Sequence, residues 1–259
     1  MMHIGPILTN VADLDTLDIS LATPMFDTLK VVSGWGVPHG WTTETRAFAL
    51  AAAPTTIVRT VSGDGCGGQR MLDPQAVVAE IAPWHALKRR IWIELGNEPN
   101  SVKTPLTEAE CWTWRYYLLA TIEICRRAFP KAKLIAPGLS QTKGLGSERF
   151  YPVCLDAIAS CDAVAVHAYA HRAFDDDGQL RRGLFQAADA HKPIWLSEFG
   201  INDPTQTGAE KGRAYAAVLR GQPQLLGATY YHLNIKQDVD GQYHIGQSGE
   251  SALGNGLRA

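Results

Sequence analysis

Short apolar runs alternate with amphipathic stretches along most of this 259-residue chain. The runs are rich in β-branched side chains, as expected for buried strands, and the stretches between them carry apolar residues at helical spacing. Strands that alternate with helices are typical of parallel β/α architecture. The predicted strands are 3–8, 30–33, 55–61, 91–95, 133–136, 162–167, 193–197 and 227–232.

Capping signals between these strands predict where helices begin. Asp73 followed by Pro74 predicts an N-cap with proline at the first helical position. Thr107 and Glu110 have the spacing of a capping box, and Pro130 ends the helix that they begin. The other predicted helices start near Thr42 or Thr43 and cover 150–159, 179–191 and 209–219, and a short segment, 251–257, remains for a reduced final helix.

The strand count and the chain length predict the fold class. Eight predicted strands in 259 residues favour one domain, 1–259, that forms a closed (β/α)8 TIM barrel with short loops. A doubly wound open sheet is the competing architecture, but no GxGxxG motif follows any strand. In a β/α barrel the C-terminal ends of the strands meet at one face, where catalytic residues lie. The side chains at these strand ends are therefore the candidate functional residues.

Two strand ends carry a glutamate. Glu98 follows the run 91–95 within the sequence Gly-Asn-Glu-Pro-Asn, and Glu198 follows the run 193–196 within Ser-Glu-Phe-Gly. Two such carboxyl groups suit glycosidic cleavage, because one protonates the leaving oxygen while the other attacks the anomeric carbon, at roughly 5–5.5 Å separation in retaining enzymes. The alternative for each glutamate alone is a structural acid that binds a cation or loop amides.

Strand alternation predicts that both glutamates point into the barrel mouth. By this count Glu94 shares a face with Glu98, and Ile194 and Leu196 share a face with Glu198.

At these two motifs the chain resembles the clan A glycoside hydrolases, the barrel group that includes families 5, 39 and 79. The resemblance implies two-step, retaining hydrolysis of a β-linked glycan, with Glu98 as acid/base, Glu198 as nucleophile and Asn97 bonded to the sugar 2-hydroxyl. Glu98 is then expected to start protonated, its pKa raised by the charge on Glu198. Short loops favour an open groove and endo-type cleavage of a polysaccharide. A barrel that has lost turnover and only binds glycan is the alternative.

Other aromatic and imidazole side chains are candidate substrate contacts. His167 and Tyr169 follow the strand 162–167, and the resemblance implies that they bond the nucleophile and sugar hydroxyls. A buried histidine tied to a backbone carbonyl is the alternative for His167. Tyr231 stands where many clan members have a tryptophan that stacks on the sugar. Trp35 and Trp41 flank the loop after the strand 30–33, where they predict either a sugar platform or packing at the barrel rim.

Arg59 lies inside the predicted strand 55–61 and cannot be buried without a partner. One interpretation is an ion pair with Glu94 on the next strand, and the other is that Arg59 holds Glu198 ionised. The remaining tryptophans are expected in the core: Trp84, Trp92, Trp112, Trp114 and Trp195.

Charge and hydropathy narrow the function classes further. The chain carries 24 Lys and Arg against 26 Asp and Glu, a formal charge of −2, so we expect no nucleic-acid partner. It contains neither an apolar run of membrane-spanning length nor a signal-peptide pattern, so we expect no membrane partner. We expect a protein that lacks its own export signal or has lost it, which leaves the compartment open.

The metal-ligand and thiol residues are scattered. The five cysteines form no CxxC pair, so reduced thiols are expected, with a link between Cys154 and Cys161 left open. Histidines and carboxylates show no metal-ligand spacing, which argues against a metal-dependent barrel hydrolase. We therefore expect a monomer without metal or cofactor whose partner is an oligo- or polysaccharide.

Overall fold

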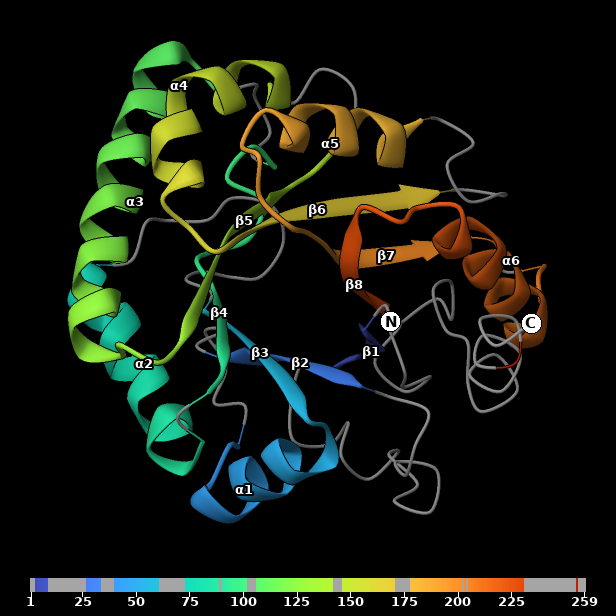
Figure 1. The fold of residues 1–259 in the computed structure, drawn as a ribbon, viewed down its shortest axis with the longest axis horizontal. Coiled ribbons are helices and arrows are strands. Elements are labelled where there is room, and N and C mark those ends of the chain that lie inside the picture. Colours follow the sequence, from blue (N-terminus) through green and yellow to red (C-terminus); the bar gives the residue numbers. More distant parts are fainter. Residues whose placement is uncertain are drawn as a thin grey trace.

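The computed structural model describes residues 3–8, 27–33, 40–60, 73–88, 90–101, 106–141, 146–170, 178–201, 203, 205–230 and 255. Eight parallel strands form one closed barrel in chain order. Figure 1 shows the strands at the centre with helices α1 to α6 around them. The predicted (β/α)8 barrel is confirmed.

The strands lie close to their predicted positions. They are β1 (His3–Leu8), β2 (Thr28–Ser33), β3 (Thr55–Thr60), β4 (Trp92–Glu94), β5 (Lys133–Leu139), β6 (Ala163–Ala170), β7 (Ile194–Ile201) and β8 (Leu225–Tyr230). The barrel closes where β1 pairs with β8, from His3 opposite Gly227 to Pro6 opposite Tyr230.

The described helices are α1 (Thr43–Ala52), α2 (Pro74–Leu87), α3 (Glu108–Ala128), α4 (Ser147–Ala159), α5 (Gln179–Ala188) and α6 (Gly208–Arg220). Their caps explain most of these starts. Asp73 accepts a hydrogen bond from the Gln75 amide, and Thr107 forms the predicted capping box with Glu110. The predicted final helix, 251–257, lies almost entirely outside the described residues.

The barrel interior is apolar near the N-terminal ends of the strands. Trp195 fills this level together with small and branched residues of three other strands: Ile57, Ile135, Ala163 and Ala165. A larger apolar core lies between the strands and the helices, and Leu196 and Ile194 belong to it. The buried charged side chains of the described strands, such as Arg59 and Glu198, gather toward the C-terminal mouth of the barrel.

The alternation predicted for β7 is wrong. Trp195 packs inside the barrel, whereas Ile194 and Leu196 pack in the outer core. The β6–β7 register then shifts, because Val166 pairs with Leu196 but the next residue, His167, pairs with Glu198. Ser197 is the extra residue of this β-bulge, which turns Glu198 inward although Leu196 points outward.

The expected core tryptophans are buried with one clear exception. Trp84 and Trp195 are fully buried and Trp114 nearly so, and Trp92 is partly buried. The prediction for Trp112 is wrong, because its side chain lies on the outer face of α3 and is 41% exposed. The Arg115 guanidinium lies over the Trp112 ring, 5.2 Å from the ring centre.

The described cysteines are all unpaired and buried: Cys111, Cys125, Cys154 and Cys161. The question left open for Cys154 and Cys161 is therefore answered, since no bond joins them. Among the described helices, none combines the length and the apolar character that crossing a membrane requires.

Candidate active site

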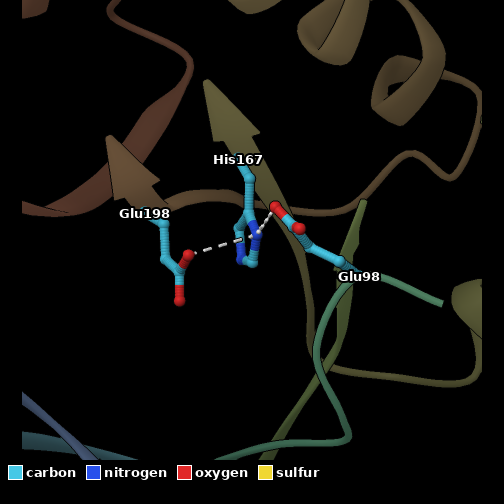
Figure 2. A group of neighbouring side chains, drawn as sticks. All are labelled: Glu98, His167 and Glu198. Carbon is cyan, nitrogen blue, oxygen red and sulfur yellow. Dashed lines mark hydrogen bonds and ion pairs between the residues drawn. The ribbon is translucent and has the colours of Figure 1, made fainter. Parts of the chain in front are cut away.

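Glu98, His167 and Glu198 meet at the C-terminal mouth of the barrel (Figure 2). His167 projects from β6, Glu198 from β7, and Glu98 from the loop that follows β4. His167 Nδ1 lies 3.0 Å from Glu98 Oε1 and 3.5 Å from Glu198 Oε2. One oxygen of each carboxylate and one ring nitrogen all lie within 4.8 Å of one another. The structure thus brings the two predicted glutamates together.

The backbone at Glu98 is held in an unusual conformation. Glu98 has a φ of 40°, in the left-handed region that residues other than glycine seldom adopt. Its amide donates to the Gly138 carbonyl at 2.8 Å, and its own carbonyl accepts from the Ser101 amide at 2.8 Å. These bonds hold the loop after β4 in a shape that aims the carboxylate at the mouth.

Cationic and hydroxyl groups surround the Glu198 carboxylate, which is almost fully buried. Tyr169 Oη donates to Oε2 at 2.8 Å. Arg59 makes a direct ion pair with Oε1, and Lys30 Nζ lies 3.6 Å from the same oxygen. Two nearby cations and a hydroxyl donor favour the ionised carboxylate. Of the two interpretations of Arg59, the structure bears out the contact with Glu198.

Asn97 also contacts Arg59, whose Nη1 donates to Asn97 Oδ1 at 2.6 Å. Because a guanidinium can only donate, this contact fixes which end of the amide is the oxygen. Arg59 of β3 thus holds both Asn97, which follows the neighbouring strand β4, and Glu198 on β7 across the barrel.

Lys30 is the site residue that the sequence analysis missed. It lies on β2, is fully buried, and places Nζ 2.6 Å from Glu94 Oε2. Nζ also donates to the Ser197 carbonyl at 2.9 Å. Burial lowers the pKa of Lys30 to about 7, and repulsion from Arg59 adds to this effect. A charge inside a buried strand, the signal used for Arg59, would have identified Lys30 as well.

Burial raises the pKa of both Glu94 and Glu98, but nearby hydrogen-bond donors and cations outweigh it. Lys30 and His167 lower the pKa of Glu94 to about 2. The His167 contact likewise brings the pKa of Glu98 below its usual value. The expectation of a raised Glu98 pKa is therefore wrong for the unliganded site, because the imidazole faces this carboxylate directly.

His167 is not tied to a backbone carbonyl, which was the alternative for this residue. It is fully buried between carboxylates, with Nδ1 toward Glu98 and Nε2 3.4 Å from Glu94 Oε1. The ring fits there because β5 carries Gly138 beside it. A Cβ at Gly138 would lie 2.1 Å from His167 Nε2, well inside any allowed contact.

Tyr231 and Trp35, the other predicted sugar contacts, lie outside the described residues. Trp41 is described and packs at the barrel rim. Its Nε1 donates to the Val32 carbonyl at 3.1 Å, and its ring meets Trp84 edge to face at 5.1 Å. Rim packing is therefore the interpretation that the structure supports for Trp41.

The cluster of Glu98, His167 and Glu198 has the spacing of a metal site. However, Arg59 and Lys30 already neutralise charge at Glu198, and a dication would have to compete with both. The arrangement suits proton transfer between a histidine and two carboxyl groups better than it suits metal binding.

A TIM barrel with two adjacent carboxylates at its mouth defines the class of this protein, a retaining glycoside hydrolase. The family model of the cellulases, glycosyl hydrolase family 5, matches residues 73–236. The chain belongs to this family, and the resemblance to clan A is confirmed. No curated protein matches the sequence.

Solved structures of polysaccharide hydrolases share the fold at low sequence identity. A triple variant of the endo-β-1,4-glucanase of Xanthomonas axonopodis pv. citri is 13% identical, with full coverage of both chains and a TM-score of 0.70. An endo-β-1,4-mannanase of Thermotoga petrophila is 14% identical, covering 100% of this chain and 76% of that one, with a TM-score of 0.67. Xylanase 10B of T. petrophila RKU-1, bound to xylobiose, is 14% identical, covering 99% and 94%, with a TM-score of 0.66.

Proposed function

We propose that this protein cleaves a β-linked polysaccharide internally, with Glu198 as nucleophile and Glu98 as acid/base. The observation that carries the proposal is the approach of the two carboxylates, whose nearest oxygens lie within 4.8 Å across the mouth. This separation suits direct attack on the sugar, whereas inverting enzymes keep their carboxyl groups about 6.5–9.5 Å apart to admit a water molecule.

In the first step Glu198 attacks the anomeric carbon while the glycosidic C–O bond breaks. Glu98 gives its proton to the leaving oxygen, so the aglycone departs as an alcohol and Glu98 becomes a carboxylate. The ion pair with Arg59 and the hydrogen bond from Tyr169 hold Glu198 ionised for attack. Asn97, oriented by Arg59, would bond the sugar 2-hydroxyl, a contact that strengthens as the oxocarbenium character develops.

In the second step water attacks the glycosyl-enzyme ester. The Glu98 carboxylate takes a proton from that water, the bond from carbon to Glu198 breaks, and both carboxyl groups return to their starting states. Two inversions at one carbon retain its configuration.

The similar structures support a polysaccharide substrate and internal cleavage. Two of them are described as an endo-β-1,4-glucanase and an endo-β-1,4-mannanase, and the matched family is that of the cellulases. We therefore propose a β-1,4-linked main chain as the first substrate class to test, with Trp35 and Tyr231 as further sugar contacts.

Trapping with activated 2-deoxy-2-fluoro glycosides tests the mechanism. The fluorine slows the second step, so the glycosyl-enzyme should accumulate and appear as one adduct in the intact mass. Peptide mapping should place this adduct on Glu198. A Glu98→Ala variant should lose hydrolysis of natural glycan, keep activity on substrates with activated leaving groups, and form a glycosyl azide when azide is added.

Glu123→Gln is the matched control, because Glu123 is an exposed glutamate of α3 and should leave trapping and hydrolysis unchanged. An adduct on any residue other than Glu198, or a product of inverted configuration, would refute the proposed roles. Soluble glycan that loses single terminal sugars without a rapid fall in viscosity would refute internal cleavage.

A further inference from the structure

Glu94 and Lys30 form a buried charged pair directly beneath the two candidate catalytic glutamates. Both side chains are fully buried, and Nζ of Lys30 lies 2.6 Å from Glu94 Oε2. The other oxygen of Glu94, Oε1, accepts from Ser197 Oγ at 3.0 Å and faces His167 Nε2 at 3.4 Å. A lysine, a serine and a histidine therefore all meet one carboxylate that touches neither Glu98 nor Glu198.

The contact between Glu94 and His167 determines where the imidazole carries a proton. Lys30 keeps Glu94 ionised, and a carboxylate can only accept hydrogen bonds. Nε2 of His167 must therefore carry hydrogen. In the neutral ring Nδ1 then carries no hydrogen, and its lone pair faces Glu98 Oε1 at a distance of 3.0 Å.

A lone pair and a carboxylate in contact repel each other unless a proton lies between them. With one proton present, either Glu98 is a carboxylic acid that donates to Nδ1, or His167 is an imidazolium that donates to Glu98. Both states keep Nε2–H bonded to Glu94. The proton is therefore held more tightly than it would be if Nδ1 could itself carry hydrogen in the neutral ring.

We propose that Glu94, held by Lys30, is a positioning residue that fixes the Nε2–H tautomer of His167, so that His167 and Glu98 share the proton delivered to the leaving oxygen. The inference rests on the proposed role of Glu98 as acid/base. Delivery of the proton leaves neutral His167 and the Glu98 carboxylate, which then takes a proton from water in the second step.

The groups around this pair act on the same proton and must be considered with it. Glu198 Oε2 lies 3.5 Å from Nδ1, but it already accepts from Tyr169 Oη. Strands β5 and β8 contribute Gly138 and Thr229, which do not titrate. Among the residues that the structure describes, the charged or titratable neighbours are Lys30 on β2, Arg59 on β3, Glu98 after β4, Tyr169 on β6 and Glu198 on β7.

Nitrogen-15 NMR of histidine-labelled protein tests the tautomer without any need for turnover. The His167 signals are assigned as those that disappear in His167→Gln. Above the pH at which the shared proton leaves, the wild-type ring should be neutral with hydrogen on Nε2. A neutral wild-type ring with hydrogen on Nδ1 would overturn the proposal, whether or not any Glu94 variant folds.

Glu94→Gln tests the consequence for catalysis. A glutamine can donate to Nε2, so the neutral ring should switch to Nδ1–H and stabilise the Glu98 carboxylate. The alkaline limb of kcat/KM should then move down by about one pH unit. Loss of activity should be confined to natural glycan and be small for activated leaving groups, which need no acid. Glu123→Gln, the same change on the outer face of α3, should shift neither readout.

A Glu94→Gln variant that keeps the Nε2–H tautomer would overturn the proposal, and so would an unchanged alkaline limb. Because Lys30, whose pKa is lowered to about 7, also contributes to the pH profile, the tautomer is the deciding measurement. If instead the proposed function is wrong, the 2-fluoro glycosides do not react with the protein, but His167 still has the Nε2–H tautomer. If this inference is wrong, Glu198 is labelled by the 2-fluoro glycoside, but the neutral His167 ring carries its hydrogen on Nδ1.

Discussion

Replacing Gly138 by alanine gives a sharp test of how much the site depends on the position of His167. The added Cβ would lie 2.1 Å from Nε2 and 2.3 Å from Cδ2 of that ring. To reach an ordinary contact of 3.4 Å, the nitrogen must move by about 1.3 Å. The 3.0 Å contact with Glu98 and the 3.4 Å contact with Glu94 cannot both survive such a shift. Misplacement by about 1 Å costs about 10²-fold in rate.

The assay is kcat/KM on the glycan that the trapping experiment identifies, with urea unfolding measured on the same samples. Gly138→Ala should lower kcat/KM about 100-fold. It should also lower the free energy of unfolding by about 1–3 kcal/mol, the usual cost of overpacking. Gly183→Ala is the matched control. Gly183 lies on α5, and its added Cβ would lie 2.4 Å from Cγ1 of Val166, which is next to His167 on β6 but faces out of the barrel. This variant should keep wild-type kcat/KM.

Two results would refute this reasoning. If Gly138→Ala folds and keeps wild-type kcat/KM, the position of His167 does not matter for catalysis. If Gly183→Ala loses as much activity as Gly138→Ala, the loss reflects general disturbance of β6, and the contact with Glu98 and Glu94 is not its cause.

Three further predictions concern stability and reactivity. The pKa of Glu94 is about 2 in the folded protein and 4.5 when unperturbed, so its charge stabilises the fold by about 3 kcal/mol above pH 4.5. This contribution is lost as the pH falls toward 2. Between pH 2 and pH 6, the free energy of urea unfolding should therefore depend less on pH in Glu94→Gln than in wild type. Thr107→Ala removes a capping box, so the free energy of unfolding should fall by about 1 kcal/mol with kcat/KM unchanged, and equal stability would show that the cap is redundant. Burial raises the pKa of the Cys154 and Cys161 thiols to about 12 and that of Cys125 to about 11, so these thiols stay protonated at pH 8. Iodoacetamide at pH 8 should therefore label them only after denaturation, which peptide mass mapping can check.

The sequence was sufficient to predict the barrel because its strands are nearly uniform apolar runs separated by capped helices. Asp73 with Pro74 and Thr107 with Glu110 predicted two helix starts correctly, since both signals are local. The helix after β5 begins at Ser147, before the predicted range 150–159, because Gly146 precedes it without a side-chain cap that the sequence would reveal.

The site was predicted less completely, because two of its features depend on tertiary contacts. The bulge at Ser197 is invisible in the sequence, so strict alternation placed Trp195 on the wrong face. Glu198 nevertheless points inward, as predicted, because the extra residue reverses the alternation. The charge within its strand marks Lys30 as a candidate, but its partner, Glu94, lies two strands away in the barrel, so the sequence does not show which group it pairs with.

The pairing of β1 with β8 also bears on how the chain folds during synthesis. His3 lies opposite Gly227, so β1 has no partner on one side until synthesis has reached β8. At about 5–20 residues per second, translation separates these two strands by about 10–45 s. During that time β1 exposes unpaired amide and carbonyl groups on the nascent chain. We therefore expect ribosome-bound fragments that end before β8 to be protease-sensitive and prone to association. We expect this exposure of β1 to end when β8 leaves the ribosome tunnel.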